Sequence, residues 1–512
     1  ALPWQFVSKP SLTSKTEAMR KIFYLLAMLL PAWSSICGQN DFEQYAHEQE
    51  VSFKAYSDKE ETDFKAYSDS VNREFGRYLT EAWPDCPLIK PEQPIKNPVP
   101  PETFDPSKQR PTPMKQPVRG EIELPAAPLP LPDADKNPPL PQKPFQDSRG
   151  MEVEASFFGT TIILPKITAR FPHLIGTDEP HVASYWNALS AMPYEMWIAH
   201  IGKLKSLLGL NDWGLYLLIG DVFKAYCPQG SENEQVVFSV FTLNQLGCKA
   251  KTGRTGQELL PLIAFNCEAY NALYFTFPTE QGIRYSVIDR KHRSLSSVKC
   301  YTLNHAIAHR PADVSLPEFP HLTADIRTKT LNDRRNDYRL AYNKNLVDFY
   351  ATLPCVSFAV YGQAALDPVF LKSVERQLAP ALQGMTQEAA INYLLHFVQY
   401  AFQYKTDEEQ FGYEKWFFAE ETIASSYSDC EDRSILFTQL VRHLLKMPIV
   451  LVYYPGRHLA TAVRFSNTDT TGDYITVDGT KYLLCDPTYI GADLGMGMPQ
   501  LMGIPIEIIK LK

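Results

Sequence analysis

The sequence predicts an α+β protein built from several folded units, and three observations support this. A chain of 512 residues is longer than one hydrophobic core usually organises. From residue 151 onward, stretches with helical apolar spacing alternate with strand-like runs. Nineteen of the 40 prolines lie between Pro84 and Pro144, and they separate a repetitive N-terminal stretch from a globular remainder. We therefore expect five segments: residues 1–38, 39–83, 84–150, 151–345 and 346–512.

Composition and charge narrow the function classes. The net charge is −8 and the isoelectric point is about 5.8, so the chain lacks the excess of basic residues that is typical of proteins that bind nucleic acid. None of the nine cysteines forms a CxxC pair, which argues against a zinc ribbon or a thioredoxin-type site. An odd, dispersed set of cysteines does not predict a disulfide framework, although an isolated pair stays open in an exported protein.

Residues 1–38 have the pattern of a secretory signal. Met19 is followed by two basic residues, by the apolar run Ile22–Pro31 and then by small residues. We interpret residues 1–18 as sequence upstream of the true start and expect export to the periplasm or the extracellular space. Ile36 before Cys37 is a poor lipoprotein signature, so anchoring at Cys37 is the less favoured route. A buried N-terminal helix is the alternative, and no transmembrane span is expected in the mature chain.

Residues 39–83 carry an 11-residue aromatic repeat. Eleven residues are almost three helical turns, so the repeated side chains fall on one nearly straight stripe. One long amphipathic helix of about 60 Å is the simplest prediction. Two roles stay open: the stripe packs on the protein's own body, or residues 41–79 mediate self-association or docking on an envelope partner. The repeated pairs are Phe42 and Tyr45, Phe53 and Tyr56, Phe64 and Tyr67, and Phe75 and Tyr78.

The proline-rich residues 84–150 are predicted to form an extended strap or linker. Each proline removes a backbone donor and fixes φ, so the segment cannot be the interior of a helix or a sheet. A polyproline-like conformation is the expected one.

Residues 151–345 are predicted to form an α+β domain. Val153–Pro165 is typical of two strands around a Gly-Thr turn. Helical spacing covers Tyr185–Leu208 and Val236–Leu246, and residues 301–365 give no clear assignment. Strand-like runs follow the helices at Leu260–Phe265, Ala272–Phe277 and Arg284–Ile288.

The last segment, residues 346–512, presents a cysteine at a predicted helix start. Two helical stretches, Pro368–Leu382 and Gln387–Tyr404, precede it. Ser428 or Asp429 is the expected N-cap of the next helix, and acidic residues occupy its first turn. Cys430 therefore sits where unpaired N–H groups and the helix dipole favour a thiolate, the nucleophilic form of cysteine.

Strands after this helix carry two further polar residues. His458 stands at the head of the predicted strand Leu459–Phe465, which follows the strand Ile449–Tyr454. Asp486 closes the last strand of a hairpin around Asp478-Gly479, a strong turn signal. A helix packed on such a sheet can bring Cys430, His458 and Asp486 together. His458 would then act as general base and acid, and Asp486 would orient its ring.

Three sequence blocks resemble the transglutaminase-like superfamily over roughly residues 366–490. They are Asp429-Cys430-Glu431-Asp432, Gly456 to Val463, and Asp486-Pro487-Thr488. The resemblance implies a papain-like fold, with a helix bundle packed on an antiparallel sheet and a Cys–His–Asp triad in this chain order. It also implies thiol chemistry on a peptide or protein amide through an acyl-enzyme, with no metal and no organic cofactor required. The stretch Gln410–Trp416 resembles the segment before the nucleophile, so Gln410 or Trp416 is expected to line the site or assist the oxyanion.

Residues 230–289 repeat the same order of features in a degenerate form, which we call the worn copy. In this alignment Glu232 replaces the nucleophile, Glu258 replaces the base and Asp289 is retained. Carboxylates at the nucleophile and base positions cannot carry out acyl transfer through a thiol. The hypothesis is a catalytically dead transglutaminase-like domain over residues 151–345, and an unrelated α+β domain is the alternative.

The sequence thus predicts a secreted, multidomain cysteine hydrolase or acyltransferase that acts on amide bonds through Cys430. The rival interpretation is a non-catalytic envelope binding or assembly scaffold built from transglutaminase-like domains. The sequence identifies neither the substrate nor the oligomeric state, and it does not choose between hydrolysis and acyl transfer.

Overall fold

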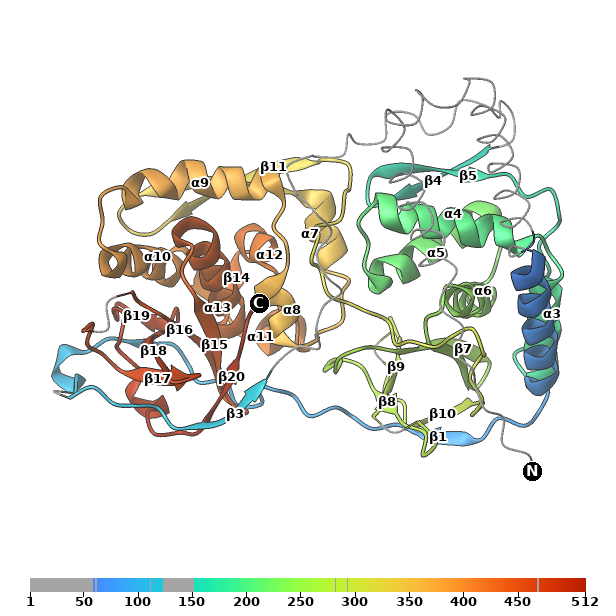
Figure 1. The fold of residues 1–512 in the computed structure, drawn as a ribbon, viewed down its shortest axis with the longest axis horizontal. Coiled ribbons are helices and arrows are strands. Elements are labelled where there is room, and N and C mark those ends of the chain that lie inside the picture. The colour runs from blue at the N-terminus through green and yellow to red at the C-terminus, as the bar shows by residue number, and fades with distance from the viewer. Residues whose placement is uncertain are drawn as a thin grey trace, which may run out of the picture. The chain divides into compact units, whose positions relative to one another are not determined.

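The computed structural model describes residues 59, 62–110, 112–122, 152–280, 282–291, 293–466 and 469–512 (Figure 1). The predicted signal over residues 1–38, the first two Phe/Tyr pairs and the proline-rich residues 123–150 lie outside this part. The chain divides into two units, residues 1–70 and 71–512. Within the described part, no helix is both long enough and apolar enough for a bilayer crossing.

The end of the aromatic repeat is helical, as the sequence predicts. Residues 62–78 form a continuous helix. Phe64 and Tyr67 are exposed, whereas Phe75 is 3% exposed. The ring centroid of Phe75 lies 4.9 Å from that of Trp186. The last repeat therefore packs on the protein's own body, which is the first of the two predicted roles.

A six-stranded sheet, the first sheet, forms the centre of the region before residue 301. Its neighbours are antiparallel throughout. Apolar residues alternate poorly along β7, because both of its faces are covered. The order is β1 (Asp85–Pro87), β10 (Ser297–Cys300), β6 (Ala250–Thr255), β7 (Glu258–Ala264), β9 (Tyr285–Val287), β8 (Tyr274–Phe275).

Four helices and a hairpin accompany the first sheet, and α6 packs against β6 and β7 (Figure 1). The helical stretch predicted over Tyr185–Leu208 is divided at Pro193, which cannot continue the preceding helix. Helix α5 was not predicted, because it is apolar on nearly all sides and lacks a clear amphipathic period. The elements are β4 (Glu152–Phe157), β5 (Thr160–Pro165), α3 (Glu179–Ser190), α4 (Tyr194–Leu207), α5 (Asp212–Tyr226) and α6 (Glu232–Gln245).

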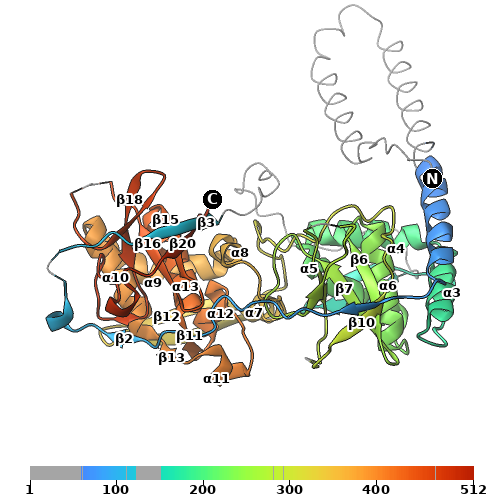
Figure 2. The same cartoon turned by 90° about the horizontal axis from the view of Figure 1, so that it is seen from below.

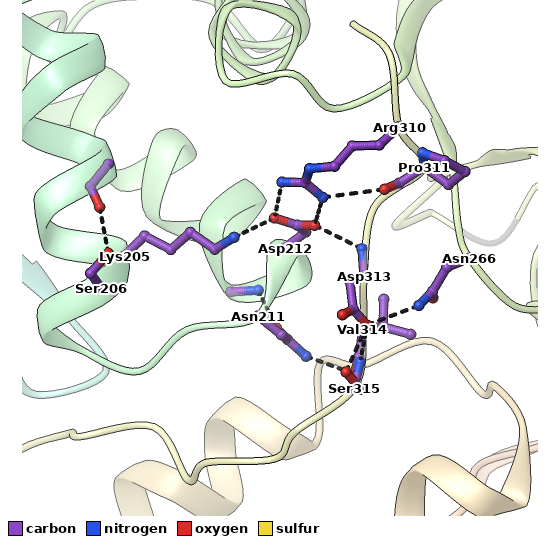
Figure 3. Close-up of polar contacts among 12 residues, drawn as sticks. Lys205, Ser206, Asn211, Asp212, Asn266, Arg310, Pro311, Asp313, Val314 and Ser315 are labelled. Atoms are coloured by element: carbon purple, nitrogen blue, oxygen red, sulfur yellow. Dashed lines mark hydrogen bonds and ion pairs between the residues drawn. The ribbon is translucent and has the colours of Figure 1, made fainter. Parts of the chain in front are cut away.

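A buried carboxylate ties α4 and α5 to the segment that follows the first sheet (Figure 3). Asp212 accepts a hydrogen bond of 2.6 Å from Lys205 and pairs with Arg310. It also accepts from the backbone N–H of Asp313 at 2.7 Å. Burial alone would raise the pKa of Asp212, but the hydrogen bonds and charges of Arg310 and Lys205 hold it at about 2. Lys205 and Arg310 thus both form ion pairs with the same carboxylate, which joins the three segments.

A second six-stranded sheet forms the centre of the C-terminal region. One face is covered by α13 and its helical neighbours, and the other by the segments around Phe104 and Met498. The turn at Asp478-Gly479 has positive φ at both residues, as the hairpin signal predicts. The order is β17 (Tyr474–Val477), β18 (Thr480–Cys485), β16 (His458–Val463), β15 (Ile449–Tyr454), β20 (Ile506–Ile509), β3 (Val118–Ile122).

The two sheets share one topology. Without the edge strands β1 and β3, each sheet contains five strands. When these five strands are numbered in chain order, both sheets have the spatial order five, one, two, four, three. Every neighbour within these sets of five is antiparallel. A helix precedes the first strand in both halves, namely α6 and α13 (Cys430–Leu440). The fold therefore contains an internal duplication.

The proline-rich stretch from residue 84 to 122, which we call the strap, adds an edge strand to each sheet (Figure 2). β1 pairs with β10 in the first sheet, and β3 pairs with β20 in the second. Between them, the carbonyl of Pro94 accepts from the N–H of Gly456 at 2.8 Å, and the N–H of Val99 donates to Arg457 at 3.0 Å. The strap is thus extended, as predicted, but it is a part of both sheets and more than a spacer.

The remaining elements connect the halves and support α13. The hairpin of β11 and β12 occupies the region that the sequence left unassigned, and α9 has the predicted bounds. They are β2 (Glu102–Thr103), β11 (Ile326–Asn332), β12 (Asp337–Asn343), α7 (Lys344–Tyr350), α8 (Phe358–Gln363), α9 (Pro368–Leu382), α10 (Gln387–Ala401), β13 (Gln403–Tyr404), α11 (Asp407–Phe411), α12 (Ala419–Ala424), β14 (Tyr427–Ser428) and β19 (Tyr489–Ile490).

Candidate active site

Helix α13 begins at Cys430, with Asp429 as its N-cap residue. The carboxylate of Asp432 accepts from the backbone N–H of Phe417 at 2.8 Å and from that of Asp429 at 3.3 Å. These bonds satisfy helix-start donors and fix the first turn against the preceding segment. The predicted position of Cys430 at a helix N-terminus is confirmed.

His458 and Asp486 form a hydrogen-bonded pair on adjacent strands. His458 is the first residue of β16, and Asp486 follows the last residue of β18. The Nε2 atom of His458 lies 2.9 Å from Oδ2 of Asp486. Thr488 donates to the other carboxylate oxygen through its hydroxyl at 2.7 Å and its N–H at 2.9 Å. The carboxylate is therefore held from two sides, so the ring of His458 has a fixed orientation.

The electrostatics of this pair favour an ionised carboxylate. Burial alone would raise the pKa of Asp486, but the charge and hydrogen bond of His458, together with those from Thr488, lower it below the ordinary value. Within the described residues, Nδ1 of His458 is buried without a hydrogen-bond partner. Since Asp486 engages Nε2, Nδ1 is the ring nitrogen left to accept a proton.

The thiol of Cys430 lies beside the residue that follows His458. The backbone N–H of Leu459 is near enough to the Cys430 sulfur to lower the pKa of the thiol, and the hydroxyl of Ser434, one turn further along α13, donates to the Leu459 carbonyl at 2.8 Å. Side-chain exposure is 0% for His458, and residue exposure is 1% for Cys430 and 5% for Asp486. Helix α13, which starts at Cys430, packs against β16, which starts at His458, and all three predicted residues are buried.

The environment of the thiol differs from the prediction. Cys430 donates a hydrogen bond of 2.8 Å to Glu431. Burial raises the pKa of Cys430 well above its ordinary value, and the negative charges of Glu431 and Asp429 raise it further. These effects outweigh the helix end, which the sequence predicted to favour the thiolate. The sequence could not show the depth of burial or the direction in which the neighbouring carboxylates turn.

A pocket of about 540 Å³ opens beside the residues that flank Cys430. Asp407, Asp429 and Glu431 line it, together with Glu414, residues of the strap and the segment Tyr270–Leu273. Carboxylate oxygens of Asp407, Asp429 and Glu431 all lie within 4.8 Å of one another. These three residues could hold a cation. Glu431 and Asp432 were predicted to complement the charge of the helix end, with metal binding as the less favoured alternative, and Asp407 had no predicted role.

Burial raises the pKa of these carboxyls, and the crowding of acids adds to it for Asp407, Asp429 and Glu414. Burial is the largest cause for Asp407, whose pKa rises to about 10 with further contributions from Asp432 and Glu431. Burial and the charge of Glu431 raise the pKa of Glu414 to about 7. The only sequence signal for this cluster was the acidic run at residues 407–409.

Gln410 and Trp416 each make a hydrogen bond within their own segment of the chain, and their expected part in the site stays a prediction. The amide of Gln410 donates to the carbonyl of Lys405 at 2.9 Å. Trp416 is 0% exposed, and its indole N–H donates to Glu414 at 2.9 Å. Its ring stacks on Phe358 with centroids 4.1 Å apart. The single indole donor of Trp416 is therefore already engaged, whereas the amide of Gln410 has a second N–H.

The worn copy has a corresponding cluster of charged residues. Glu232 is the first residue of α6, Glu258 is the first residue of β7, and Asp289 follows β9. Lys291 lies 3.3 Å from Glu232 and 3.0 Å from Glu258. Arg293 pairs with Glu258, and also with Asp289 at 3.0 Å. The three aligned positions do meet, but they are joined by two cations that the sequence analysis missed.

No known protein family and no curated protein sequence matches this chain.

Proposed function

We propose that the C-terminal half is a cysteine-dependent enzyme of transglutaminase-like type that cleaves or transfers amide-linked acyl groups through Cys430. The observation that carries this proposal is the hydrogen-bonded pair of His458 and Asp486 at the start of β16, the strand on which α13 packs, and α13 begins at Cys430. Unrelated cysteine enzymes use the same three residue types for nucleophilic catalysis.

The proposed reaction has two steps. The sulfur of Cys430 attacks the carbonyl carbon of an amide while Nδ1 of His458 takes the thiol proton. The C–N bond then breaks, His458 returns the proton to the departing amine, and a thioester remains on Cys430. Water or a second amine attacks the thioester and releases the acyl group, and His458 again relays the proton.

The raised pKa of Cys430 specifies how the thiol is activated. A thiol that is protonated at neutral pH has no standing thiolate. Proton transfer to His458 must therefore accompany the attack, as in serine-type catalysis. The ionised Asp486 stabilises the imidazolium that forms in this step.

A non-catalytic scaffold is the second candidate function, and two observations favour it. Cys430 is 1% exposed, so a substrate reaches the sulfur only if the surrounding segments move. The duplicated half carries Glu232 and Glu258 at the aligned positions, and it keeps its fold without a nucleophile. In this function the polar cluster around Cys430 would serve only to hold α13 on the sheet.

Labelling of the thiol with an acyl-fluoride probe separates the two candidates. Mass spectrometry of the peptide that contains Cys430 should show acylation in the wild-type chain. Cys430→Ala removes that product, while Cys227→Ala, which removes a partly exposed cysteine elsewhere, leaves it unchanged. A folded wild-type protein whose Cys430 stays unlabelled while Cys227 is acylated would favour the scaffold.

A further inference from the structure

The acidic cluster beside the nucleophile has the features of a cation site. Asp407 comes from α11, whereas Asp429 and Glu431 flank Cys430 at the start of α13. Oxygens from all three lie within 4.8 Å of one another. One ion at about 2.4 Å from each oxygen requires separations no larger than this, and 2.3–2.6 Å is the range of calcium–oxygen bonds.

The cluster also contains carboxylate oxygens that lack partners. Asp407 is 3% exposed and Asp429 is 4% exposed. Within the described residues, Oδ1 of each is buried without a hydrogen-bond partner. The other oxygen of Asp407 accepts from the backbone N–H of Lys415 at 2.7 Å. A buried, unpaired carboxylate oxygen is costly unless a proton or a cation compensates it.

The nearby basic side chains of Lys415 and Arg433 bond to groups outside the acidic cluster. Lys415 donates to Glu421 at 3.1 Å. Arg433 donates to Ser428 at 3.1 Å and to the carbonyl of Phe402 at 2.8 Å. In the part of the chain that the structure describes, no lysine or arginine forms an ion pair with Asp407, Asp429 or Glu431. The pocket that these three residues line connects the cluster with space for additional water ligands.

We propose that Asp407, Asp429 and Glu431 bind one calcium ion, with water from the pocket completing the coordination. Three carboxylates from two helices suit Ca²⁺, which takes six to eight oxygens in flexible geometry. Mg²⁺ is the poorer fit, since it demands a near-ideal octahedron at 2.0–2.1 Å and usually keeps most of its water. The site does not require a reactive Cys430, so it stands apart from the proposed catalysis.

Calcium titration of the full chain tests the site. Protein stripped with EDTA and dialysed should bind one Ca²⁺ in isothermal titration calorimetry, and its melting temperature should rise with the Ca²⁺ concentration. Asp407→Asn keeps an acceptor for the N–H of Lys415 and removes one ligand charge, so it should weaken binding at least tenfold. Glu375→Gln, an exposed change of the same charge on α9, should bind as the wild type does.

Several results would overturn the assignment. They are no binding at 5 mM Ca²⁺, wild-type affinity in a folded Asp407→Asn variant, or tighter binding of Mg²⁺ than of Ca²⁺. If Asp407→Asn fails to fold, Glu431→Gln serves as the second variant with the same expected loss. Cys430→Ala should keep the affinity for Ca²⁺, so failure of the catalytic proposal and failure of the calcium site give different results.

Discussion

The sulfur of Cys430 lies 2.8 Å from the carboxylate of Glu431, the next residue in the chain. A carboxylate in this position holds the proton on the thiol, whereas the helix end alone would favour its release. Both residues are buried, so little solvent screens the interaction. The chemistry of the site therefore depends on the balance between Glu431 and the base His458.

The charge of Glu431 can be removed without changing the shape of the side chain. In buffer with EDTA, Glu431→Gln should lower the pKa of Cys430, because one of the charges that raise it is lost. Iodoacetamide should then alkylate Cys430 faster at pH 8 than it does in the wild type, by roughly tenfold if the pKa falls by about one unit. Glu408→Gln, an exposed change on α11, is the control. An unchanged or slower rate in Glu431→Gln would contradict the electrostatic account.

Asp486 is predicted to act through the ring of His458. Asp486→Asn should slow acylation of Cys430 by about 10²–10⁴-fold, because the amide fixes neither the tautomer nor the charge of the imidazolium. Thr488→Val removes one hydroxyl bond to Asp486 and should slow it less. Stopped-flow or quenched-flow acylation with an activated ester measures both rates. Equal effects in the two variants would contradict the prediction that the Asp486 carboxylate matters more than the hydroxyl bond from Thr488.

Glu420 makes stability depend on pH between the ordinary pKa of glutamate and about 8. Burial raises the pKa of Glu420 to about 8, well above that of an unfolded glutamate, so the folded state binds this proton more tightly. Its contribution is complete below the unfolded pKa and is lost as the pH rises through about 8. The melting temperature should therefore fall between about pH 5 and pH 8, with no further fall from this group at higher pH. Glu420→Gln keeps an acceptor for the N–H of Asp367 and should flatten this fall; an equal slope in both proteins would refute it.

The aromatic repeat offers a matched pair of truncations. Phe75 is 3% exposed and Phe64 is 46% exposed. Phe75→Ala should lower the free energy of unfolding by about 3–5 kcal/mol, as expected for a buried phenylalanine, whereas Phe64→Ala should change it by less than about 0.5 kcal/mol. Urea denaturation measures both. Similar losses would mean that the repeat packs along its whole described length.

The charged cluster of the worn copy is predicted to be neither catalytic nor strongly stabilising. Glu258 is 42% exposed in its side chain, and solvent-exposed ion pairs contribute about 0–1 kcal/mol. Glu258→Gln should therefore change the free energy of unfolding by no more than about 1 kcal/mol and leave acylation of Cys430 unchanged. A large loss of acylation would show that this half takes part in the reaction.

Local sequence signals predicted most of the elements that position the site. The cap at Asp429, the hairpin at Asp478-Gly479 and the strand that begins at His458 each depend on residues close in the chain. Such signals are readable because caps and turns have specific residue requirements. The order of Cys430, His458 and Asp486 along these elements, with the family resemblance, predicted that they lie together, and the structure pairs His458 with Asp486.

Long-range features escaped the sequence. The direction of the Glu431 side chain and the approach of Asp407 from another helix depend on tertiary packing, which no local pattern records. Helix α5 was missed because burial on nearly all sides removes the amphipathic period. The strap shows the same limit: its prolines predicted an extended chain, but not its pairing with β10 and β20.

Dependence of Cys430 acylation on His458 is the most direct test of the central claim. The rate at which an acyl fluoride modifies the peptide that contains Cys430 should be compared between the wild type and His458→Ala at pH 7. The account predicts a loss of at least 100-fold in the variant, with unchanged modification of Cys227. Equal acylation of Cys430 in both proteins would contradict the claim that His458 activates this thiol.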